Sequence, residues 1–277
     1  MPDSAIRGPR PISAIGSALD QLSLVTDAVN DRTLLLFLDF DGTLAPIVNA
    51  PGDAALDPEV RRTLETLVSR TPVAILSGRD RADVQARVGV QDIVYAGSHG
   101  LDIRGPGLVH QVGLEALPAL DRARARLDRS LTTIEGTEVE PKKFGLAVHY
   151  RRMDGQWLDH LEALVAEVAG EEPSLRVVRG KKVVELRPDV DWDKGSALTW
   201  LATRLPTAGR GSGLRLYIGD DVTDEDAFRA VGAEGVSIVV RGEDDTRMSR
   251  ARFSLADPGD VAYFLSRLAD SGDSSLT

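Results

Sequence analysis

The chain has 277 residues, and its 33 Lys and Arg against 43 Asp and Glu give a formal net charge of −10 at pH 7. An acidic chain without a basic block is not typical of proteins that bind nucleic acid or anionic lipid, so neither is expected as a partner. Hydrophobic residues make up 42% of the chain, which is enough for a sizeable core. The absence of cysteine excludes disulfides, thiolate metal sites and cysteine nucleophiles.

The ends of the chain and its hydropathy suggest a soluble location. No apolar run approaches the ~18 residues of a membrane span. The N-terminus lacks the basic and apolar pattern of a secretory signal, and three prolines within residues 1–12 predict a loose tail. We therefore expect a cytoplasmic protein that does not bind membranes. The sequence does not determine an oligomeric state, and a monomer is the favoured expectation.

The first part of the chain alternates helices with short, wholly apolar strands. Such strands are typical of a parallel sheet buried on both faces. Asp57 is the expected N-cap of one helix, with Pro58 at its first position. The alternation predicts a doubly wound α/β core. Helices are expected at 13–30, 57–69 and 80–88, and strands at 34–38, 73–76 and 93–96.

The pattern changes after a glycine-rich stretch at 105–113, which we interpret as a linker. The residues that follow predict an α+β insert with an antiparallel sheet, because two apolar runs flank a turn at Gly180-Lys181. Helices are expected at 114–130 and 155–169, and strands at 133–139, 145–151, 175–179 and 182–187.

From Trp192 the first pattern resumes. A glycine-rich loop at 209–213 and a polar tail at 271–275 are expected to be flexible. The predicted organisation is an N-terminal tail and helix over 1–30, a core from 31–107 and 189–277, and an insert over 108–188. The remaining helices are expected at 193–204, 223–230 and 258–269, and the strands at 214–218 and 235–239.

Carboxylates follow two of the apolar strands. Asp39 and Asp41 end one strand, and Asp220 and Asp221 end another, with Asp224 close behind. Ligands of α/β sheets bind outside the carboxyl ends of strands. Clustered carboxylates repel one another unless a cation lies among them, and oxygen ligands without Cys or nearby His favour Mg²⁺ over zinc. The alternative is a turn after each strand and an acidic loop that caps the next helix.

Two further motifs open helices. Ser77-Gly78-Arg79 follows the second strand, where a hydroxyl and backbone N–H groups suit an anion. Lys194 begins the helix after the insert, a position that the helix dipole disfavours for a cation, so a role in neutralising phosphate is one interpretation. The alternatives are an ordinary serine N-cap and a solvated lysine.

Asp39-Phe40-Asp41-Gly42-Thr43, Ser77, Lys194 and Gly219-Asp220-Asp221 stand in the order used by the haloacid dehalogenase-like phosphatases, and the chain resembles that superfamily. Segments in and near the insert resemble the trehalose-6-phosphate phosphatase family more closely. In that family the insert is a cap that closes over the core and reads the sugar. The segments are Gly97-Ser98-His99-Gly100, Val139-Glu140-Pro141-Lys142-Lys143, His149-Tyr150-Arg151 and 180–188.

The resemblance implies Mg²⁺-dependent hydrolysis of trehalose 6-phosphate, the last step of trehalose biosynthesis. Asp39 is the implied nucleophile and Asp41 the general acid and base, with Ser77 and Lys194 on the phosphoryl oxygens. The implied metal ligands are Asp39, the backbone carbonyl of Asp41, and Asp220, supported by Asp221 or Asp224. Implied substrate contacts are Gly42, Gly78, Arg79, His99, Glu140, Lys142 (or its neighbour Lys143), His149, Lys181, Glu185 and Arg187.

Three alternatives remain at this point. The core motifs also fit another sugar-phosphate phosphatase of the same superfamily, for example one that acts on sucrose-phosphate. A non-catalytic sugar-phosphate-binding subunit is a second alternative, although such a scaffold usually loses its nucleophile or a metal carboxylate. Within the insert, the charged residues also fit cross-strand ion pairs on a solvated sheet face.

Overall fold

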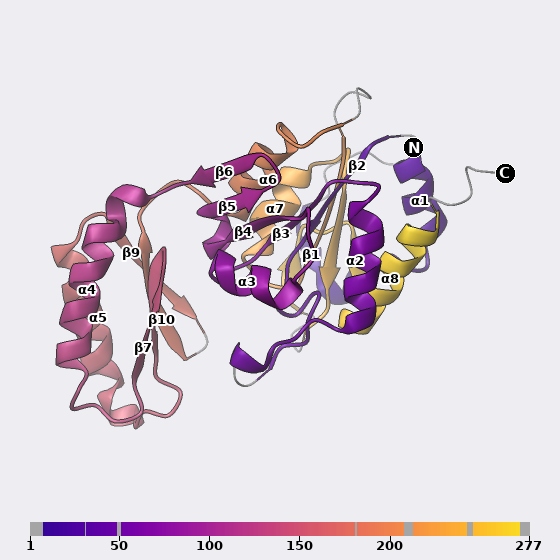
Figure 1. Cartoon of the computed structure of the whole chain (residues 1–277). Helices are drawn as coiled ribbons and strands as arrows, with labels where there is room; N and C mark the ends of the chain where they lie inside the picture. The colour runs from indigo at the N-terminus through magenta and orange to yellow at the C-terminus, as the bar shows by residue number, and fades with distance from the viewer. Residues whose placement is uncertain are drawn as a thin grey trace. The chain divides into compact units, whose positions relative to one another are not determined.

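A computed structural model describes residues 8–30, 32–48, 51–180, 182–207, 213–242 and 246–271. Residues 1–7 of the tail expected over 1–12, Lys181, most of the glycine-rich loop and the C-terminal tail from 272 lie outside the described residues. The chain folds into two compact units: the first unit comprises residues 1–109 and 192–277, and the second unit comprises residues 110–191 (Figure 1).

An eight-stranded sheet forms the centre of the first unit. Its strand order is β14-β12-β11-β2-β3-β4-β5-β6. The pairs from β14 to β4 are parallel, and β5 is antiparallel to β4. The strands are β2 (Leu34–Leu38), β3 (Val73–Leu76), β4 (Val94–Gly97), β5 (Asp102–Gly105), β6 (Leu108–Gln111), β11 (Leu214–Gly219), β12 (Val236–Val240) and β14 (Phe253–Leu255).

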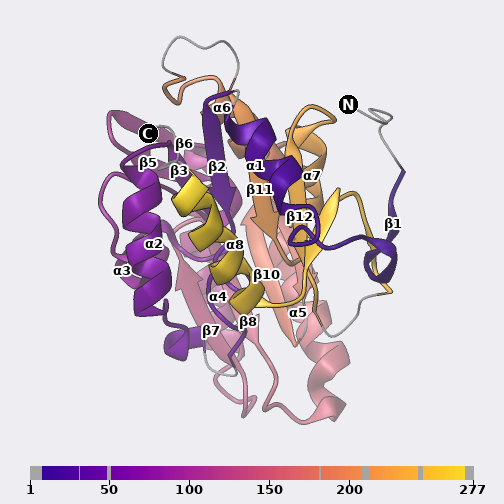
Figure 2. The ribbon, with the colours of Figure 1, turned by 90° about the vertical axis from the view of Figure 1, so that its right-hand side faces the viewer.

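Helices cover both faces of this sheet, which is why its central strands are apolar throughout. Alternate side chains of β2 enter two separate cores: Leu36 packs in one and Phe37 in the other. Figure 2 shows α1, α2 and α8 on one face. That face carries α1 (Leu22–Asn30), α2 (Pro58–Val68), α3 (Arg81–Val88) and α8 (Pro258–Ser271), and the other carries α6 (Lys194–Ala202) and α7 (Asp224–Val231).

The strand order reverses at β2. The chain runs from β2 to β3 and β4 on one side, and later to β11, β12 and β14 on the other. The carboxyl ends of β2 and β11 therefore lie next to each other at the point where the two halves of the sheet diverge. In doubly wound sheets this is where ligands bind, and it is where Asp39 and Asp220 stand.

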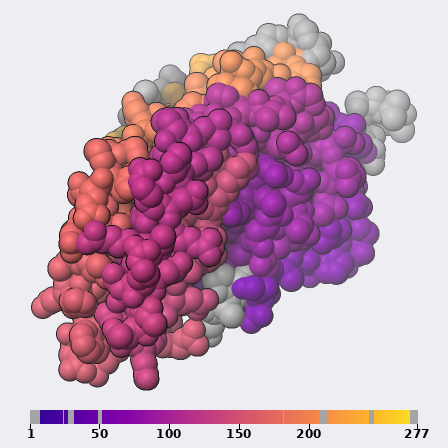
Figure 3. All heavy atoms as spheres, turned by 60° about the vertical axis from the view of Figure 1, so that its left-hand side comes forward, coloured from indigo at the N-terminus to yellow at the C-terminus, as the bar shows by residue number. Residues whose placement is uncertain are grey.

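The second unit is an antiparallel sheet with two helices on one face. The strand order is β7-β8-β10-β9. Leu146, Val148, Val184 and Leu186 pack with the helices in one core. Figure 3 shows the surface atoms of one side of the molecule, those of this unit in magenta to salmon. The elements are α4 (Leu117–Ser130), α5 (Leu158–Glu171), β7 (Glu138–Lys142), β8 (Gly145–His149), β9 (Leu175–Gly180) and β10 (Val183–Pro188).

Several local predictions are confirmed. The apolar runs at 34–38 and 73–76 are strands, and the Asp57 side chain caps α2 by accepting a hydrogen bond from Glu59 N. The fold class is the predicted doubly wound α/β core with an α+β insert. No helix within the described ranges is long and apolar enough to span a membrane.

Four local predictions were wrong. Residues 10–12, expected to belong to a loose tail, instead form the short strand β1 (Arg10–Pro11) and the start of a 3-10 turn at Ile12–Ala14, because they pair with residues far along the chain. The helix expected from residue 13 begins only at Leu22. The expected linker at 105–113 instead supplies most of the β5–β6 strand pair. The strand expected at 133–139 begins only at Glu138, because Gly136 adopts a left-handed conformation, with φ +81°, tight against the Arg152 backbone.

Short elements complete the description. The strand β13 (Met248–Ser249) pairs with β1 as a separate antiparallel ribbon, which the sequence did not predict. The remaining 3-10 turns span Pro51–Asp53, Ser98–Gly100, Leu114–Ala116 and Gly155–Trp157.

Candidate active site

Three carboxylates gather at the carboxyl ends of β2 and β11. Asp39 follows β2, Asp220 follows β11, and Asp224 begins α7. One oxygen from each lies within 4.8 Å of those of the other two. The backbone N–H of Asp39 donates to the carbonyl of Ile218 at 2.9 Å, which links the residue after β2 to the neighbouring strand. Residues from distant parts of the sequence therefore share one site.

Lys194 supplies the buried positive charge of the cluster. Its Nζ donates to Oδ1 of Asp39 at 2.9 Å and to Oδ1 of Asp224 at 2.7 Å. The Lys194 side chain is 2% exposed and that of Asp224 is fully buried, so both charges depend on this pairing. Lys194 is thus not a solvated lysine. Ion pairs with Asp224 and Asp39 outweigh burial and raise the pKa of Lys194, so it stays charged.

Tyr217 holds the same carboxylate from the strand side. Its hydroxyl donates to Oδ1 of Asp224 at 2.5 Å, and the backbone N–H of Asp221 donates to Oδ2 at 2.9 Å. The sequence pattern indicates only a packing residue at Tyr217, and the side chain is indeed fully buried. The sequence does contain a signal for this contact: a tyrosine stands within an apolar strand, two residues before Gly219-Asp220. A buried tyrosine hydroxyl usually has a hydrogen-bond partner, so a polar group was to be expected beside it.

The cluster carries more negative than positive charge. Burial, with the charge of Asp224 added, raises the pKa of Asp39 to about 7 despite the opposing effect of Lys194. Burial and the nearby Asp39 and Asp224 charges raise the pKa of Asp220 to about 9. The Oδ1 atom of Asp220 is buried and, within the described part of the chain, has no hydrogen-bond partner. An oxygen-lined site with excess negative charge and an unsatisfied carboxylate oxygen fits a hard divalent cation such as Mg²⁺.

Gly42 makes room for the Asp220 side chain. Its φ is +75°, and a Cβ placed there would stand 2.1 Å from Oδ2 of Asp220. The glycine of the first motif is therefore required both by the backbone turn and by the approach of a carboxylate from the other half of the sheet. The substrate contact expected of Gly42 stays a prediction, and the contact that the structure shows is with the Asp220 side chain.

Asp41 is held by Arg79 rather than by the carboxylate cluster. Nε of Arg79 donates to Oδ2 of Asp41 at 2.7 Å and Nη2 donates to Oδ1 at 2.6 Å, a two-bond pairing that fixes the plane of the carboxylate. Arg79 also donates to Asp83 at 3.0 Å and lies over the Phe40 ring. Arg79, expected to contact substrate, is thus an orienting partner of the expected acid and base.

The Ser77 motif forms a tight turn beside this pair. Ser77 is fully buried, and its Oγ accepts from the backbone N–H of Arg79 at 3.1 Å. A Cβ at Gly78 would lie 2.9 Å from the His99 ring, so His99 covers this glycine. Ser98 and His99 adopt φ of +50° and +57°, which is a strained conformation for non-glycine residues.

Asp221 and Asp224, the two residues expected to support a metal, are placed differently with respect to the carboxylate cluster. The Asp221 side chain accepts a hydrogen bond from the Thr223 hydroxyl at 3.3 Å, and it is not one of the three clustered carboxylates. Asp224 carries three hydrogen bonds on its two oxygens. Of the two residues expected to support a metal, Asp224 therefore lies in the cluster and Asp221 lies outside it.

The face of the second-unit sheet opposite its helices carries most of the charged and polar residues that we singled out in the insert. Glu140 and Glu185 both stand opposite Ala147 on β8, on its two sides. Lys142 Nζ donates to Glu185 Oε1 at 2.7 Å, and Arg187 Nε donates to Oε2 at 2.6 Å. His149 Nε2 and Glu140 Oε2 are 2.7 Å apart.

The ion pairs of this network hold charged side chains in place on one face of the sheet. Lys142 and Arg187 outweigh the effect of burial and lower the pKa of Glu185, so its carboxylate stays ionised. Lys143, the alternative to Lys142, lies over the Phe144 ring, 5.2 Å from its centroid. Carboxylates, ammonium and guanidinium groups on one surface offer acceptors for hydroxyls and donors for anions.

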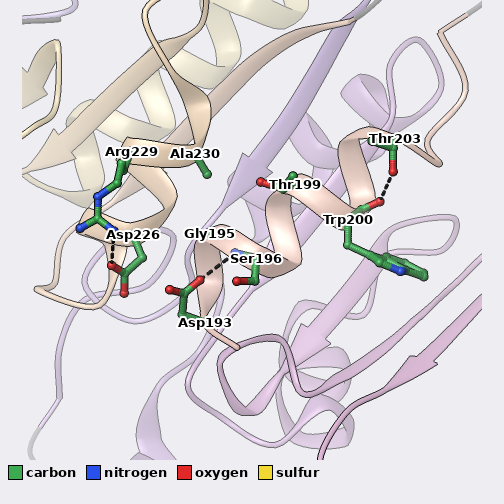
Figure 4. Close-up of a pocket in the computed structure, with 9 residues that line it drawn as sticks. All are labelled: Asp193, Gly195, Ser196, Thr199, Trp200, Thr203, Asp226, Arg229 and Ala230. Atoms are coloured by element: carbon green, nitrogen blue, oxygen red, sulfur yellow. Dashed lines mark hydrogen bonds and ion pairs between the residues drawn. The ribbon is translucent and has the colours of Figure 1, made fainter. Parts of the chain in front are cut away.

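A shallow groove of about 510 Å³ lies between α6 and α7 on the outer side of the first unit (Figure 4). Asp193 accepts from the backbone N–H of Ser196 at 2.7 Å and so caps α6, which carries Lys194. Asp226 on α7 lines the same groove, and its pKa is raised by burial and by Asp193. The groove contains none of the predicted site residues.

Comparisons with known proteins identify the family of the chain. The family model for trehalose-phosphatase matches residues 37–259. The chain is 46% identical over 266 residues to a trehalose-phosphate phosphatase of Mycobacterium tuberculosis, covering 95% of this chain and 68% of the relative.

Solved structures give the same picture for the fold. The C-terminal domain of a Candida albicans trehalose-6-phosphate phosphatase aligns with a TM-score of 0.75 at 23% identity, covering 92% of this chain and 99% of that domain. A haloacid dehalogenase-like hydrolase from Bacteroides thetaiotaomicron aligns with a TM-score of 0.59 at 15% identity, covering 86% of this chain and all of the other.

Proposed function

Because the chain belongs to the trehalose-phosphatase family, we propose that it hydrolyses trehalose 6-phosphate to trehalose and inorganic phosphate, with Asp39 as the nucleophile. It is a phosphomonoesterase of trehalose biosynthesis. The observation that carries the residue assignment is the buried contact of Asp39 with Lys194, beside Asp220 and Asp224.

The reaction has two steps at Asp39. In the first, a carboxylate oxygen of Asp39 attacks phosphorus, the bond from phosphorus to the sugar oxygen breaks, and Asp41 gives its proton to that oxygen. In the second, Asp41 takes a proton from water, the water oxygen attacks the aspartyl-phosphate, and the bond from phosphorus to Asp39 breaks. Arg79 orients the Asp41 carboxylate by donating to both of its oxygens.

Lys194 and the Ser77 turn complete the site. Lys194 already contacts the nucleophile, so its ammonium is placed to offset charge on the transferring phosphoryl group. Ser77, Gly78 and His99 form the neighbouring turn that we expect to border the phosphoryl oxygens. Charge stabilisation by such preorganised groups is the main catalytic contribution expected for phosphoryl transfer.

Mg²⁺ would be held by Asp39, Asp220 and the backbone carbonyl of Asp41. Asp224 supports Asp39 through Lys194, which bonds both carboxylates, and the Tyr217 hydroxyl and the Asp221 N–H engage its oxygens further. When bound, the ion supplies positive charge that neutralises the clustered carboxylates and the phosphate oxygens.

The polar face of the second unit is the proposed sugar-recognition surface. Glu185 is fixed between Lys142 and Arg187, and Glu140 is paired with His149. A disaccharide presents mainly hydroxyl groups, which donate to carboxylates and accept from Lys and Arg. Lys181 is proposed to join this surface on the resemblance alone.

Phosphate release from a panel of sugar phosphates tests the function. Trehalose 6-phosphate is the expected preferred substrate, with sucrose-phosphate, glucose 6-phosphate and an aryl phosphate as comparisons. Asp39→Asn is expected to be folded and inactive. A preference for sucrose-phosphate would reassign the substrate, and full activity of the Asp39→Asn variant would remove the nucleophile assignment and leave the sugar specificity standing.

A further inference from the structure

Arg247 ties the loop that carries Asp220 to a segment outside the motifs. Its Nη2 donates to the backbone carbonyl of Asp220 at 2.7 Å, and its Nη1 donates to Oε1 of Glu225 at 3.1 Å. The Arg247 and Glu225 side chains are only 19% and 17% exposed, so this pair differs from an ordinary surface ion pair. The backbone N–H of Arg250 donates to the second oxygen of Glu225.

The hydrogen bond from Arg247 to the Asp220 carbonyl matters because of where Asp220 lies. Asp220 lies directly beyond Gly219, the last residue of β11 in register with β12, so the parallel ladder does not extend to it. Its side chain packs against Gly42 and keeps one buried oxygen without a hydrogen-bond partner among the described residues. A buried carboxylate with an unpaired oxygen keeps its position only if the backbone that carries it does not move. The Arg247 guanidinium restrains this backbone through its hydrogen bond to the Asp220 carbonyl.

The segment that carries Arg247 is itself held by the N-terminal strap, which we define as residues 10–18. Ile12 N donates to the Arg247 carbonyl at 3.0 Å, and Arg10–Pro11 pair with Met248–Ser249. Ile12 and Ile15 are each 1% exposed and pack in the core on the side of α6 and α7. The strap precedes residue 37, where the match to the family model begins.

We propose that Arg247 is a positioning residue of the metal site: it holds the Asp220 backbone so that the carboxylate meets Mg²⁺ in the correct place. The inference rests on the proposed function in taking Mg²⁺ as the ion. Arg247 touches neither the ion nor the substrate in this role, because it acts through Asp220.

Electrostatics alone predicts the opposite effect for its removal. Deleting a positive charge near a carboxylate cluster makes the local potential more negative, which favours a bound cation. A positioning role instead predicts weaker Mg²⁺ binding when Arg247 is lost. Arg250 is the matched control, since it is an exposed arginine of the same segment and meets Glu225 through its backbone N–H.

The experiment is a calorimetric Mg²⁺ titration of metal-free protein without substrate. Arg247→Met is expected to raise the Mg²⁺ dissociation constant at least tenfold, and Arg247→Lys, which keeps the charge without the two-pronged guanidinium, at least threefold. Arg250→Met is expected to leave it unchanged or lower it. At saturating Mg²⁺, kcat of Arg247→Met should return to within a few-fold of the wild-type value.

The result that overturns the inference is a folded Arg247→Met protein that binds Mg²⁺ as tightly as the wild type, or more tightly. Should Arg247→Met fail to fold, unchanged affinity in Arg247→Lys overturns it equally. A wild-type protein that binds no Mg²⁺ would reject the metal assignment and this inference together. If the wild type binds Mg²⁺ and both Arg247 variants bind it with the same affinity, only the positioning role of Arg247 is rejected and the metal assignment stands.

Discussion

Lys194 and Asp224 form a buried ion pair with an Nζ–Oδ1 distance of 2.7 Å, and the same ammonium contacts Asp39. The pair connects the start of α6 to the start of α7 and thereby joins two helices to Asp39, the proposed nucleophile, at the end of β2. One cation therefore has a structural task beside its proposed catalytic one.

Lys194→Met is expected to lower both activity and stability. Its removal leaves two buried carboxylates without their counter-charge, a change that costs about 3–5 kcal/mol of unfolding free energy. The loss of phosphoryl stabilisation is expected to lower kcat by roughly 10²–10³-fold. Urea unfolding and steady-state kinetics measure the two effects.

The double variant Lys194→Met, Asp224→Asn serves as the control for the first prediction. It removes the unpaired carboxylate, so it should regain part of the lost stability while activity stays low. If the double variant is no more stable than Lys194→Met, the buried pair is not the source of the destabilisation.

The stability of the metal-free protein is expected to fall as pH rises. The pKa of Asp220 is raised to about 9 by burial and by Asp39 and Asp224, above its ordinary value of 3.8. The folded state therefore binds a proton more strongly than the unfolded state, and the stability from this group is lost progressively as pH rises from 3.8 to about 9.

Urea unfolding in a chelator at pH values of about 5.5 and about 8.5 measures this effect. Asp220→Asn cannot ionise, so its stability relative to the wild type should rise between these two pH values by up to about 4 kcal/mol, because each pH unit is worth about 1.4 kcal/mol. Saturating Mg²⁺ should remove most of the wild-type pH dependence. A difference between variant and wild type that stays constant with pH would show that Asp220 binds the same number of protons in the folded and unfolded states, so that folding does not raise its pKa.

Gly42→Ala is expected to damage the metal site specifically. The new Cβ would stand 2.1 Å from Oδ2 of Asp220, and a displacement of about 1 Å at a reacting centre can cost about 10²-fold in rate. Gly107→Ala is the matched control, because Gly107 also has a positive φ, of +68°, and a Cβ added there would have no atom within 4 Å.

Both glycine variants carry the strain of a non-glycine residue at positive φ, about 1–2 kcal/mol. Thermal unfolding should therefore shift in both, while kcat and Mg²⁺ affinity should fall only in Gly42→Ala. Equal activity losses in the two variants would mean that backbone strain, rather than the contact with Asp220, is responsible.

Glu185→Gln is expected to change substrate preference. The loss of a charged acceptor for a sugar hydroxyl costs about 1.5–3 kcal/mol, or roughly 10- to 100-fold in kcat/KM for trehalose 6-phosphate. Hydrolysis of an aryl phosphate, which lacks the sugar, should be nearly unchanged. Glu162→Gln is the control, since Glu162 pairs with Arg179 outside the polar network. Parallel losses on both substrates would exclude Glu185 from sugar recognition.

The core could be predicted from sequence because its signals are local. A five-residue apolar run such as Leu34–Leu38 is buried on both faces wherever it stands in a parallel sheet. Asp57 and Pro58 mark a helix start by themselves. The pattern failed where a partner distant in sequence decided the outcome, as at Ile15, whose helical spacing gave way to packing and hydrogen bonds against residues 241–254.

The sequence by itself determined which carboxylates, lysine and serine follow the strands and open the helices, since these positions depend on short-range pattern. Only the tertiary structure decided how they pair: Arg79 with Asp41, Tyr217 with Asp224, and Arg247 with the Asp220 carbonyl. The reason is that hydrogen bonds and burial depend on side chains that folding brings together from different strands and helices. The strength of these hydrogen bonds depends on the water-poor environment in which they lie, and that environment forms only when distant segments pack together.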